Sequence, residues 1–238
     1  MEQIKGKRIL VVGATGGIGS RVVKLLKGSG ALVFIAGRNQ EKLNQVAAEN
    51  NIDSQSVFVI DLSDQHAVQQ LKDQYFEVFD GIDVLINASG IGIIKNMDQL
   101  TEDEFFKTIQ VNLMAPFMLM KAFLPHMKEA KKGLIIHIPG VLGKTPMAGS
   151  AAYSAAKYGL IGMLHSIREE IKRTDIRITN LILGGVDSPF WDTIDLRVQK
   201  DKMIQAEEAA KAIWFLCQQP SSGVISEMVL QPFNHQAV

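Results

Sequence analysis

A tyrosine and a lysine stand four residues apart in the segment Tyr153-Ser154-Ala155-Ala156-Lys157. That spacing puts both side chains on one face of a helix. A free tyrosine, with a pKa of about 10, is a poor acid–base group at neutral pH. A neighbouring ammonium stabilises the phenolate, so the lysine is expected to bring that pKa toward the working range. Such pairs are common, and this one predicts proton-transfer chemistry only beside a second motif.

The second motif is a glycine-rich turn between an apolar run and a helical pattern, Gly13-Ala14-Thr15-Gly16-Gly17-Ile18-Gly19. Glycines are needed in such a turn because it is tight, its backbone approaches a pyrophosphate and its helix packs close to the strand. The helix N-terminus then offers free N–H groups and a partial positive charge to the phosphates. In this context the turn predicts a dinucleotide site. Its expected contacts are Gly13, Thr15, Gly16, Gly17, Ile18 and Gly19.

The end of the second apolar run discriminates between the two nicotinamide cofactors. An acid there binds the free ribose hydroxyls of NAD, whereas an arginine accommodates the extra phosphate of NADP. The chain has Arg38 at this turn, in Ile35-Ala36-Gly37-Arg38-Asn39, and no acid. Arg38 therefore favours NADP(H) over NAD(H), although most loop arginines are simply solvated.

Two further run ends supply candidate cofactor residues. Asp61 and Leu62 follow the third run and can face the adenine; a helix N-cap role for Asp61 or Ser63 stays open. The fourth run ends in a polar turn of small residues, Asn87-Ala88-Ser89-Gly90. This turn lies beside the expected path of the nicotinamide ribose, so Asn87, Ala88 and Gly90 are candidate contacts. An ordinary turn would have the same composition.

Apolar runs alternate with longer helical patterns along the whole chain. The expected strands are nearly continuous hydrophobic runs, typical of strands covered on both faces. They are Arg8–Val12, Ala31–Ala36, Val57–Ile60, Asp83–Ile86, Leu134–Ile138, Arg177–Leu183 and Met228–Leu230. The expected helices are Ile18–Lys27, Gln40–Glu49, Asp64–Phe79, Thr101–Ala130, Ala152–Thr174 and Glu207–Gln218.

This alternation predicts an α/β fold, a Rossmann-type doubly wound parallel sheet of seven strands with helices on both faces. Thr101 and Glu104 fit a capping box at the start of the fourth helix. The chain shows no linker, repeat or low-complexity segment. Residues 1–238 are therefore expected to form one dinucleotide-binding and catalytic domain.

The least regular segment covers residues 184–204. It is too long for a tight connection and follows the carboxyl end of a strand, where open α/β sheets bind ligands. We expect a mobile substrate lid around residues 187–204. An apolar mouth for an apolar or aromatic carbonyl compound is expected from Phe190, Trp191, Ile91, Ile93, Ile94 and Met147. The two lid aromatics fit the lid's own packing equally well.

Composition excludes several classes of protein. Of the residues 47% are hydrophobic and 21% charged, which suits a buried core rather than disorder. The 25 basic residues balance the 25 acidic ones, so no overall field would draw the protein to nucleic acid or an anionic membrane. The single cysteine, Cys217, makes no disulfide framework and favours a reducing, cytoplasmic setting.

Neither membrane nor metal binding is expected. The N-terminal residues lack a signal-peptide pattern, and no apolar run is long enough to span a bilayer. The histidines are scattered without the spacing of metal ligands. They are His66, His126, His137, His165 and His235.

With both motifs in place, the chain resembles the classical short-chain dehydrogenase/reductase family over nearly its whole length. The Asn87-Ala88-Ser89-Gly90 turn is similar to the family's Asn-Asn-Ala-Gly turn. The segment Leu183-Gly184-Gly185-Val186-Asp187-Ser188 resembles the family's segment over the nicotinamide amide, which implies Val186 and Ser188 as cofactor contacts.

The resemblance also implies catalytic roles. It makes Tyr153 the proton donor to a substrate oxygen and Lys157 a ligand of the nicotinamide ribose. Asn112 falls where the family keeps an asparagine that supports a water in a proton relay. A helix asparagine that bonds a backbone carbonyl near Pro116 is the other interpretation of Asn112.

One departure from the family concerns catalysis. The family carries a catalytic serine thirteen residues before the tyrosine, and that position is Gly140. Losing one such donor to the developing oxyanion costs on the order of a hundred- to a thousandfold in rate. A bound water, or the hydroxyl of Ser150 or Thr145, would compensate in part.

Two functions follow. The first is an NADP(H)-dependent oxidoreductase that moves a hydride between nicotinamide and a carbonyl or secondary alcohol. The second is a dinucleotide-binding protein with little turnover, acting as a sensor or partner subunit. The resemblance also implies a homo-oligomer, a dimer or tetramer. An apolar surface on the fourth helix is consistent with that or with core packing; it comprises Leu113, Phe117, Met120 and Phe123.

Overall fold

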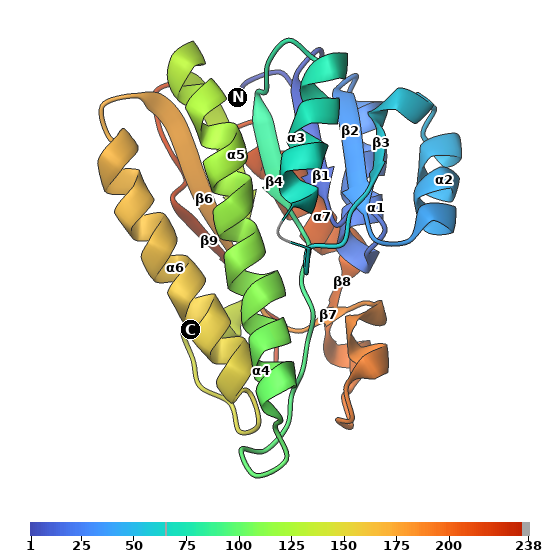
Figure 1. Ribbon diagram of the computed structural model, residues 1–238, viewed down its shortest axis with the longest axis vertical. Coiled ribbons are helices and arrows are strands. Elements are labelled where there is room, and N and C mark those ends of the chain that lie inside the picture. The colour runs from blue at the N-terminus through green and yellow to red at the C-terminus, as the bar shows by residue number, and fades with distance from the viewer. Residues whose placement is uncertain (65, 235–238) are drawn as a thin grey trace.

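A seven-stranded parallel sheet runs through the computed structural model, which describes residues 1–64 and 66–234 (Figure 1). Its strands are β1 (Arg8–Val12), β2 (Leu32–Gly37), β3 (Val57–Val59), β4 (Val84–Asn87), β5 (Lys132–His137), β6 (Asp175–Leu183) and β9 (Glu227–Leu230). Their spatial order is β3-β2-β1-β4-β5-β6-β9, with every pairing parallel. The order reverses between β1 and β4, and this crevice is where such sheets bind ligands.

Helices cover both faces of the sheet, which confirms the predicted doubly wound fold. One face carries α1 (Gly17–Gly28), α2 (Gln40–Glu49) and α7 (Ala206–Leu216) (Figure 1). The other carries α3 (Ala67–Val78), α5 (Ala115–Ala130) and α6 (Ala151–Ile171). Successive strand residues point to opposite faces, so an unbroken apolar strand feeds both cores. In β1, for example, Val11 joins the first core and Val12 the second.

Helix α3 begins three residues later than the sequence pattern predicts. The side chains of Asp61 and Asp64 accept hydrogen bonds from the backbone N–H groups of Ser63 and His66. These local bonds compete with helix formation and hold the chain in turns. Because the N-cap is His66, the N-cap role considered for Asp61 or Ser63 is wrong.

The long helix predicted over residues 101–130 is interrupted. Helix α4 (Glu102–Ile109) begins with the predicted capping box of Thr101 and Glu104. A π-helical turn, Gln110–Met114, then joins α4 to α5. Such turns occur frequently at functional sites, and this one contains the candidate residue Asn112.

The apolar surface predicted on this helix divides between core and solvent. Met120 and Phe123 are buried in the core beneath α5, and Leu113 is partly buried. Phe117 alone of these four residues is exposed, by 40%. Core packing therefore accounts for Met120, Phe123 and Leu113, and leaves Phe117 on the surface.

The segment expected to be irregular contains short elements. Strands β7 (Val186–Asp187) and β8 (Ile204–Gln205) pair with each other, separate from the main sheet. Between them lie two 3₁₀ turns, Pro189–Thr193 and Lys200–Lys202. This pairing brings the two ends of the segment together at the edge of the sheet crevice.

Candidate active site

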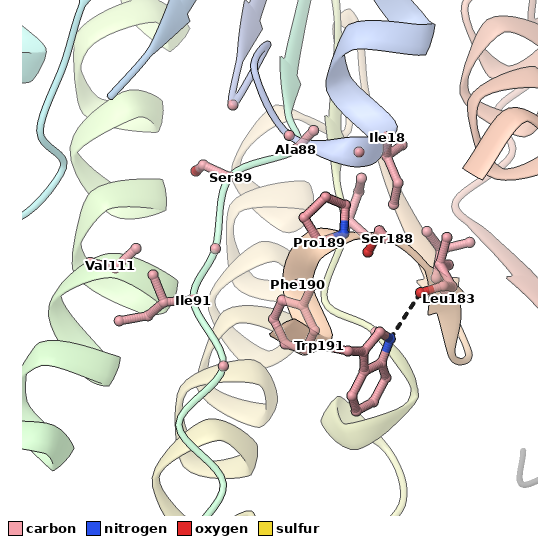
Figure 2. Close-up of a pocket in the computed structure, with 18 of the residues that line it drawn as sticks. Ile18, Ala88, Ser89, Ile91, Val111, Leu183, Ser188, Pro189, Phe190 and Trp191 are labelled. Carbon is pink, nitrogen blue, oxygen red and sulfur yellow. Dashed lines mark hydrogen bonds between the residues drawn. The ribbon is translucent and has the colours of Figure 1, made fainter. Parts of the chain in front are cut away.

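A cavity of about 480 Å³ opens at the carboxyl ends of the central strands. It extends from the glycine turn to the aromatic residues of the lid; Figure 2 shows the part between Ile18 and Trp191. Fourteen of the seventeen predicted catalytic and cofactor-binding residues line it: Gly13, Thr15, Gly16, Gly17, Ile18, Arg38, Asp61, Leu62, Ala88, Gly90, Tyr153, Lys157, Val186 and Ser188. Gly19, Asn87 and Asn112 lie outside its wall.

Two glycines of the turn, Gly13 and Gly19, are packed so tightly that a side chain would not fit at either position. Gly13 has a φ of +84°, and a Cβ there would lie 2.7 Å from the backbone of Ala88 and Ser89. Gly19 packs on the carbonyl of Gly13 with no room for a Cβ, so its role is helix packing. Helix α1 starts at Gly17, which leaves the N–H groups of its first turn without intrahelical partners. This turn fits a pyrophosphate.

Two cations stand at the far end of the cavity. Arg38 is exposed and follows β2, and Lys42 lies in the first turn of α2. The backbone and side chain of Ser63 lower the pKa of the Asp61 carboxyl, and the charge of Arg38 adds to this effect. Sequence reasoning missed Lys42, because one lysine on a polar helix face carries no signal by itself. The pair fits a phosphate on the adenosine ribose.

Lys157 is buried at the middle of the cavity, one helical turn after Tyr153. Its Nζ donates to the carbonyl of Ile138 at 3.2 Å and lies 5.3 Å from the centroid of the Tyr153 ring. Burial lowers the pKa of Lys157 to about 8. Burial raises the pKa of Tyr153 above its ordinary value, the opposite of the direction predicted from the sequence. The phenol is protonated at neutral pH, as a proton donor must be, and its raised pKa makes it a weaker acid than a free tyrosine until a bound substrate or cofactor changes its surroundings.

Asn112 clamps the loop that follows β4. Its Nδ2 donates to the carbonyl of Ile91 at 3.0 Å, and its Oδ1 accepts from the N–H of Ile91. It also bonds the helix carbonyl of Thr108 at 3.1 Å, as the second interpretation anticipated. A Cβ on Gly90 would lie 2.9 Å from Asn112 Oδ1, so a side chain there would displace Asn112 from its bonds to Ile91. Asn112 thus supports the wall that faces Lys157 without lining it.

Gly140 lines the cavity, and its backbone has a conformation that residues other than glycine rarely adopt. Its φ is +74° and its ψ is 166°, a region essentially limited to glycine. Space is not the constraint, because a Cβ would meet only the carbonyl of Leu183, at 3.6 Å. Neither Ser150 nor Thr145 lines the cavity, so the compensation expected from their hydroxyls is not seen. Ser150 is buried and donates to the carbonyl of Met147.

Two aromatic residues of the segment 187–204 line one end of the cavity, Phe190 and Trp191. Phe190 packs edge-on against Tyr153, with ring centroids 6.0 Å apart, and against Trp191 at 5.3 Å. The indole of Trp191 donates to the carbonyl of Val186 at 2.9 Å, drawn as the dashed line in Figure 2. Phe190 also fills the space beside Gly92, where a Cβ would collide with its ring.

Apolar residues make up most of the mouth. Ile91, Ile94 and Met147 line it as predicted, whereas Ile93 does not. The sequence reasoning missed Gly92, Val111, Ile138, Val141, Leu142 and Pro189. These residues carry no chemical signal, and only the folded chain brings them together.

Neither a metal-binding cluster nor a membrane-spanning helix is present in residues 1–64 and 66–234. No group of histidine, cysteine or acidic side chains there is arranged to hold a metal ion. No helix in the same ranges has the length and apolar character needed to cross a bilayer. His235 lies outside the described residues.

The parallel sheet, the cavity at its switch point and the Tyr153–Lys157 pair define a Rossmann-type oxidoreductase. The sequence model described as "short chain dehydrogenase" matches residues 7–198, and the chain belongs to this family. An uncharacterized oxidoreductase from Staphylococcus epidermidis is 27% identical over 232 residues, which cover 98% of this chain and 100% of the relative.

Solved structures agree with this assignment. A metagenomic short-chain oxidoreductase in complex with NADP has a TM-score of 0.84 and 29% identity, covering 98% of this chain and 100% of that one. An alcohol dehydrogenase from the archaeon Thermococcus sibiricus, complexed with 5-hydroxy-NADP, has a TM-score of 0.87 at 24% identity. That match covers 98% of this chain and 99% of the other. The second likeness supports the fold.

Proposed function

We propose that this chain, as a single catalytic domain, is an NADP(H)-dependent oxidoreductase that moves a hydride between nicotinamide and a carbonyl or secondary alcohol. The observation that carries the proposal is the position of Tyr153. This tyrosine lines the same cavity as the glycine turn, one helical turn before Lys157. The 29% identical metagenomic oxidoreductase, solved with NADP, supports the choice of cofactor.

The cavity provides a place for each part of the dinucleotide. The glycine turn and the first turn of α1 hold the pyrophosphate, and Arg38 with Lys42 holds the ribose phosphate. Asp61 and Leu62 border the adenine. The nicotinamide end lies among Ala88, Gly90, Lys157, Val186 and Ser188, with Asn87 beneath them. When bound there, the nicotinamide supplies or accepts the hydride.

The protein's own groups handle the proton. Tyr153 donates from its hydroxyl to the substrate oxygen as negative charge develops on that oxygen. Lys157 holds the nicotinamide ribose, and the Ile138 carbonyl fixes its Nζ. Phe190 packs against the Tyr153 ring and excludes water from this side of the phenol. The segment around residues 187–204 acts as a lid that admits substrate.

Gly140 favours a particular kind of substrate. The cavity wall has no side-chain hydroxyl at this position to share the oxyanion charge with Tyr153. An electron-poor carbonyl, such as a diketone or an aromatic aldehyde, accepts a hydride with less stabilisation of the developing oxyanion by protein donors. Such compounds also match the apolar and aromatic mouth.

The same glycine supports a second candidate function, a dinucleotide-binding protein with little turnover. The test measures NADPH binding by fluorescence and NADPH oxidation by absorbance, across aldehydes, ketones and diketones. Binding with turnover supports the oxidoreductase. Binding without turnover of any compound supports the sensor or partner subunit, and absence of binding overturns both.

We also propose a homo-oligomer, dimer or tetramer. The exposed Phe117 on α5 is one residue whose burial between copies would be favourable. Chain mass in solution, measured by light scattering, tests this proposal, and a monomer at all concentrations contradicts it.

A further inference from the structure

A row of polar side chains crosses the buried sheet beside the active site. Asn87, His137, Asn180 and Glu227 are register partners on β4, β5, β6 and β9. The residues two positions earlier on β4, β5 and β6 belong to the core beneath α5 and α6. Side chains alternate along a strand, so the row faces the same side. It lies under the helix that carries the Tyr153–Lys157 pair.

This row holds all the buried side-chain nitrogen and oxygen atoms that lack a hydrogen-bond partner within the described ranges. They are His137 Nε2, Asn180 Nδ2, Asn180 Oδ1 and Glu227 Oε1. Leaving such atoms unpaired is costly and rare in native proteins. Their concentration in one row indicates a single internal network. Several polar atoms that converge in a buried site are what an ordered internal water binds.

The donors and acceptors run in one direction along the row. Asn87 Oδ1 accepts from the N–H of Ser89 at 3.1 Å, so the amide nitrogen of Asn87 faces His137 Nδ1, 3.4 Å away. Nδ1 is therefore the acceptor and Nε2 carries the proton. Burial, followed by the charge of Lys157, lowers the pKa of His137 to about 3, which keeps the ring neutral.

The far end of the row is an ionised carboxylate. Burial raises the pKa of Glu227, but Lys144, His165 and Asn180 lower it more, and the net shift is downward. Lys144 Nζ donates to Glu227 Oε2, and His165 Nε2 lies 3.4 Å from Oε1. A carboxylate only accepts, so a direct bond between Asn180 and Glu227 runs from the Asn180 amide nitrogen, which leaves the amide oxygen for the side of His137.

We infer that His137, Asn180 and Glu227 are positioning residues, joined by ordered water into a hydrogen-bond chain that ends on Glu227 and fixes the turn at Asn87 from beneath. Gly13 packs on the backbone of this turn at Ala88 and Ser89, so the chain also supports the glycine turn. Its effect on cofactor binding rests on the proposed function. The hydrogen-bond chain itself does not.

The experiment combines NMR of the full-length protein with two variants. Long-range ¹H–¹⁵N spectra at neutral pH should show the neutral tautomer of His137 that carries its proton on Nε2, with Nδ1 unprotonated. Asn180→Val and Glu227→Gln should each shift the His137 signals and weaken NADPH binding about three- to tenfold, the effect of one lost buried hydrogen bond. The matched control Glu169→Gln removes an exposed carboxylate paired with Lys172 on the surface, and should change neither readout.

A proton on Nδ1 of His137 would overturn the inference. Unchanged His137 signals in both variants would overturn it as well. If Asn180→Val does not fold, Glu227→Gln, which keeps the shape but removes the charge and replaces one acceptor oxygen with a donor, decides alone. If the native protein binds no NADPH, the proposed function fails, while the His137 spectra still decide whether the chain exists.

Discussion

The Lys157 ammonium lies over the face of the Tyr153 ring, 5.3 Å from its centroid, rather than against an anion. Its hydrogen bond to the Ile138 carbonyl and the ring face both favour the charged form. Neither partner carries a full negative charge, so burial dominates and lowers the pKa of Lys157 to about 8. The charged form of Lys157 is therefore less stable in the folded protein than in water.

This lowered pKa predicts that the free energy of unfolding depends on pH. The folded protein releases the Lys157 proton near pH 8, whereas the unfolded chain releases it near 10.5. Between these values the unfolded state binds more protons, so the free energy of unfolding gains from Lys157 as pH rises. The gain approaches about 3 kcal/mol in the upper part of this window and is lost as pH falls through about 8.

Urea unfolding of the native protein and of Lys157→Met between about pH 7 and about pH 10 measures this gain. The difference in stability between the two proteins should shift in favour of the native protein as pH rises, because methionine does not titrate. A difference that stays constant across this range would show that Lys157 has an ordinary pKa in the folded state.

Tyr153→Phe should abolish most turnover while leaving NADPH binding within about twofold. A general acid contributes on the order of a hundred- to ten-thousandfold in rate, and phenylalanine keeps the packing against Phe190. Tyr158→Phe is the matched control, since Tyr158 is an exposed tyrosine on the same helix. Steady-state rates of NADPH oxidation give the comparison. Equal rates in the two variants would remove Tyr153 from its proposed role.

Arg38→Leu should weaken NADPH binding on the order of tenfold and leave NADH binding unchanged. The exposed guanidinium stands at the cavity end to which the proposed function assigns the extra phosphate of NADP. Arg173→Leu, at an exposed position in the turn after α6, is the control for loss of one positive charge. Fluorescence titrations with both cofactors decide the matter. An equal loss of affinity for NADH and NADPH would mean that Arg38 does not bind the extra phosphate of NADPH.

The fold could be predicted because its signals are local. Unbroken apolar runs, the glycine turn and the capping box at Thr101 each depend on a few neighbouring residues. What could not be predicted depends on competition between local bonds. Helix α3 starts late because Asp61 and Asp64 bond nearby N–H groups first. The π turn contains Asn112, whose side chain bonds the distant loop at Ile91, a contact that no local pattern indicates.

The site was predictable where chemistry has a fixed spacing, as in the Tyr153–Lys157 pair. Its electrostatics were not, because burial and the Ile138 carbonyl become visible only in the folded chain. The polar row under α6 has no sequence signature, since its members are register partners on separate strands. The backbone of Gly140 was equally hidden, because glycine adopts either sign of φ.

Gly92→Ala should disturb the lid. A Cβ at this position would collide with the ring of Phe190, which packs against Tyr153. We expect the displaced ring to raise KM for apolar carbonyls about threefold to tenfold, with little change in NADPH affinity. Gly162→Ala is the control, because a Cβ there meets nothing within 4 Å. An unchanged KM would mean that Phe190 does not contact substrate.

Gly140 requires a paired experiment, because any side chain at φ +74° strains the backbone. Gly140→Ala and Gly140→Ser should each lose on the order of 1–3 kcal/mol of stability, measured by urea unfolding. They share this strain and differ only in a hydroxyl. The ratio of their turnover rates therefore isolates what a hydroxyl contributes at this position.

If the site works with Tyr153 as its proton donor, the serine variant should exceed the alanine variant by less than about tenfold and should not exceed the native rate. Electron-poor carbonyls should then remain the best substrates in all three proteins. A serine variant that is a hundredfold or more faster than both others would show a scaffold that lacks only one donor. The native chain would then be better described as a dinucleotide-binding protein, since its tyrosine and lysine would be in place without turning substrate over at a useful rate.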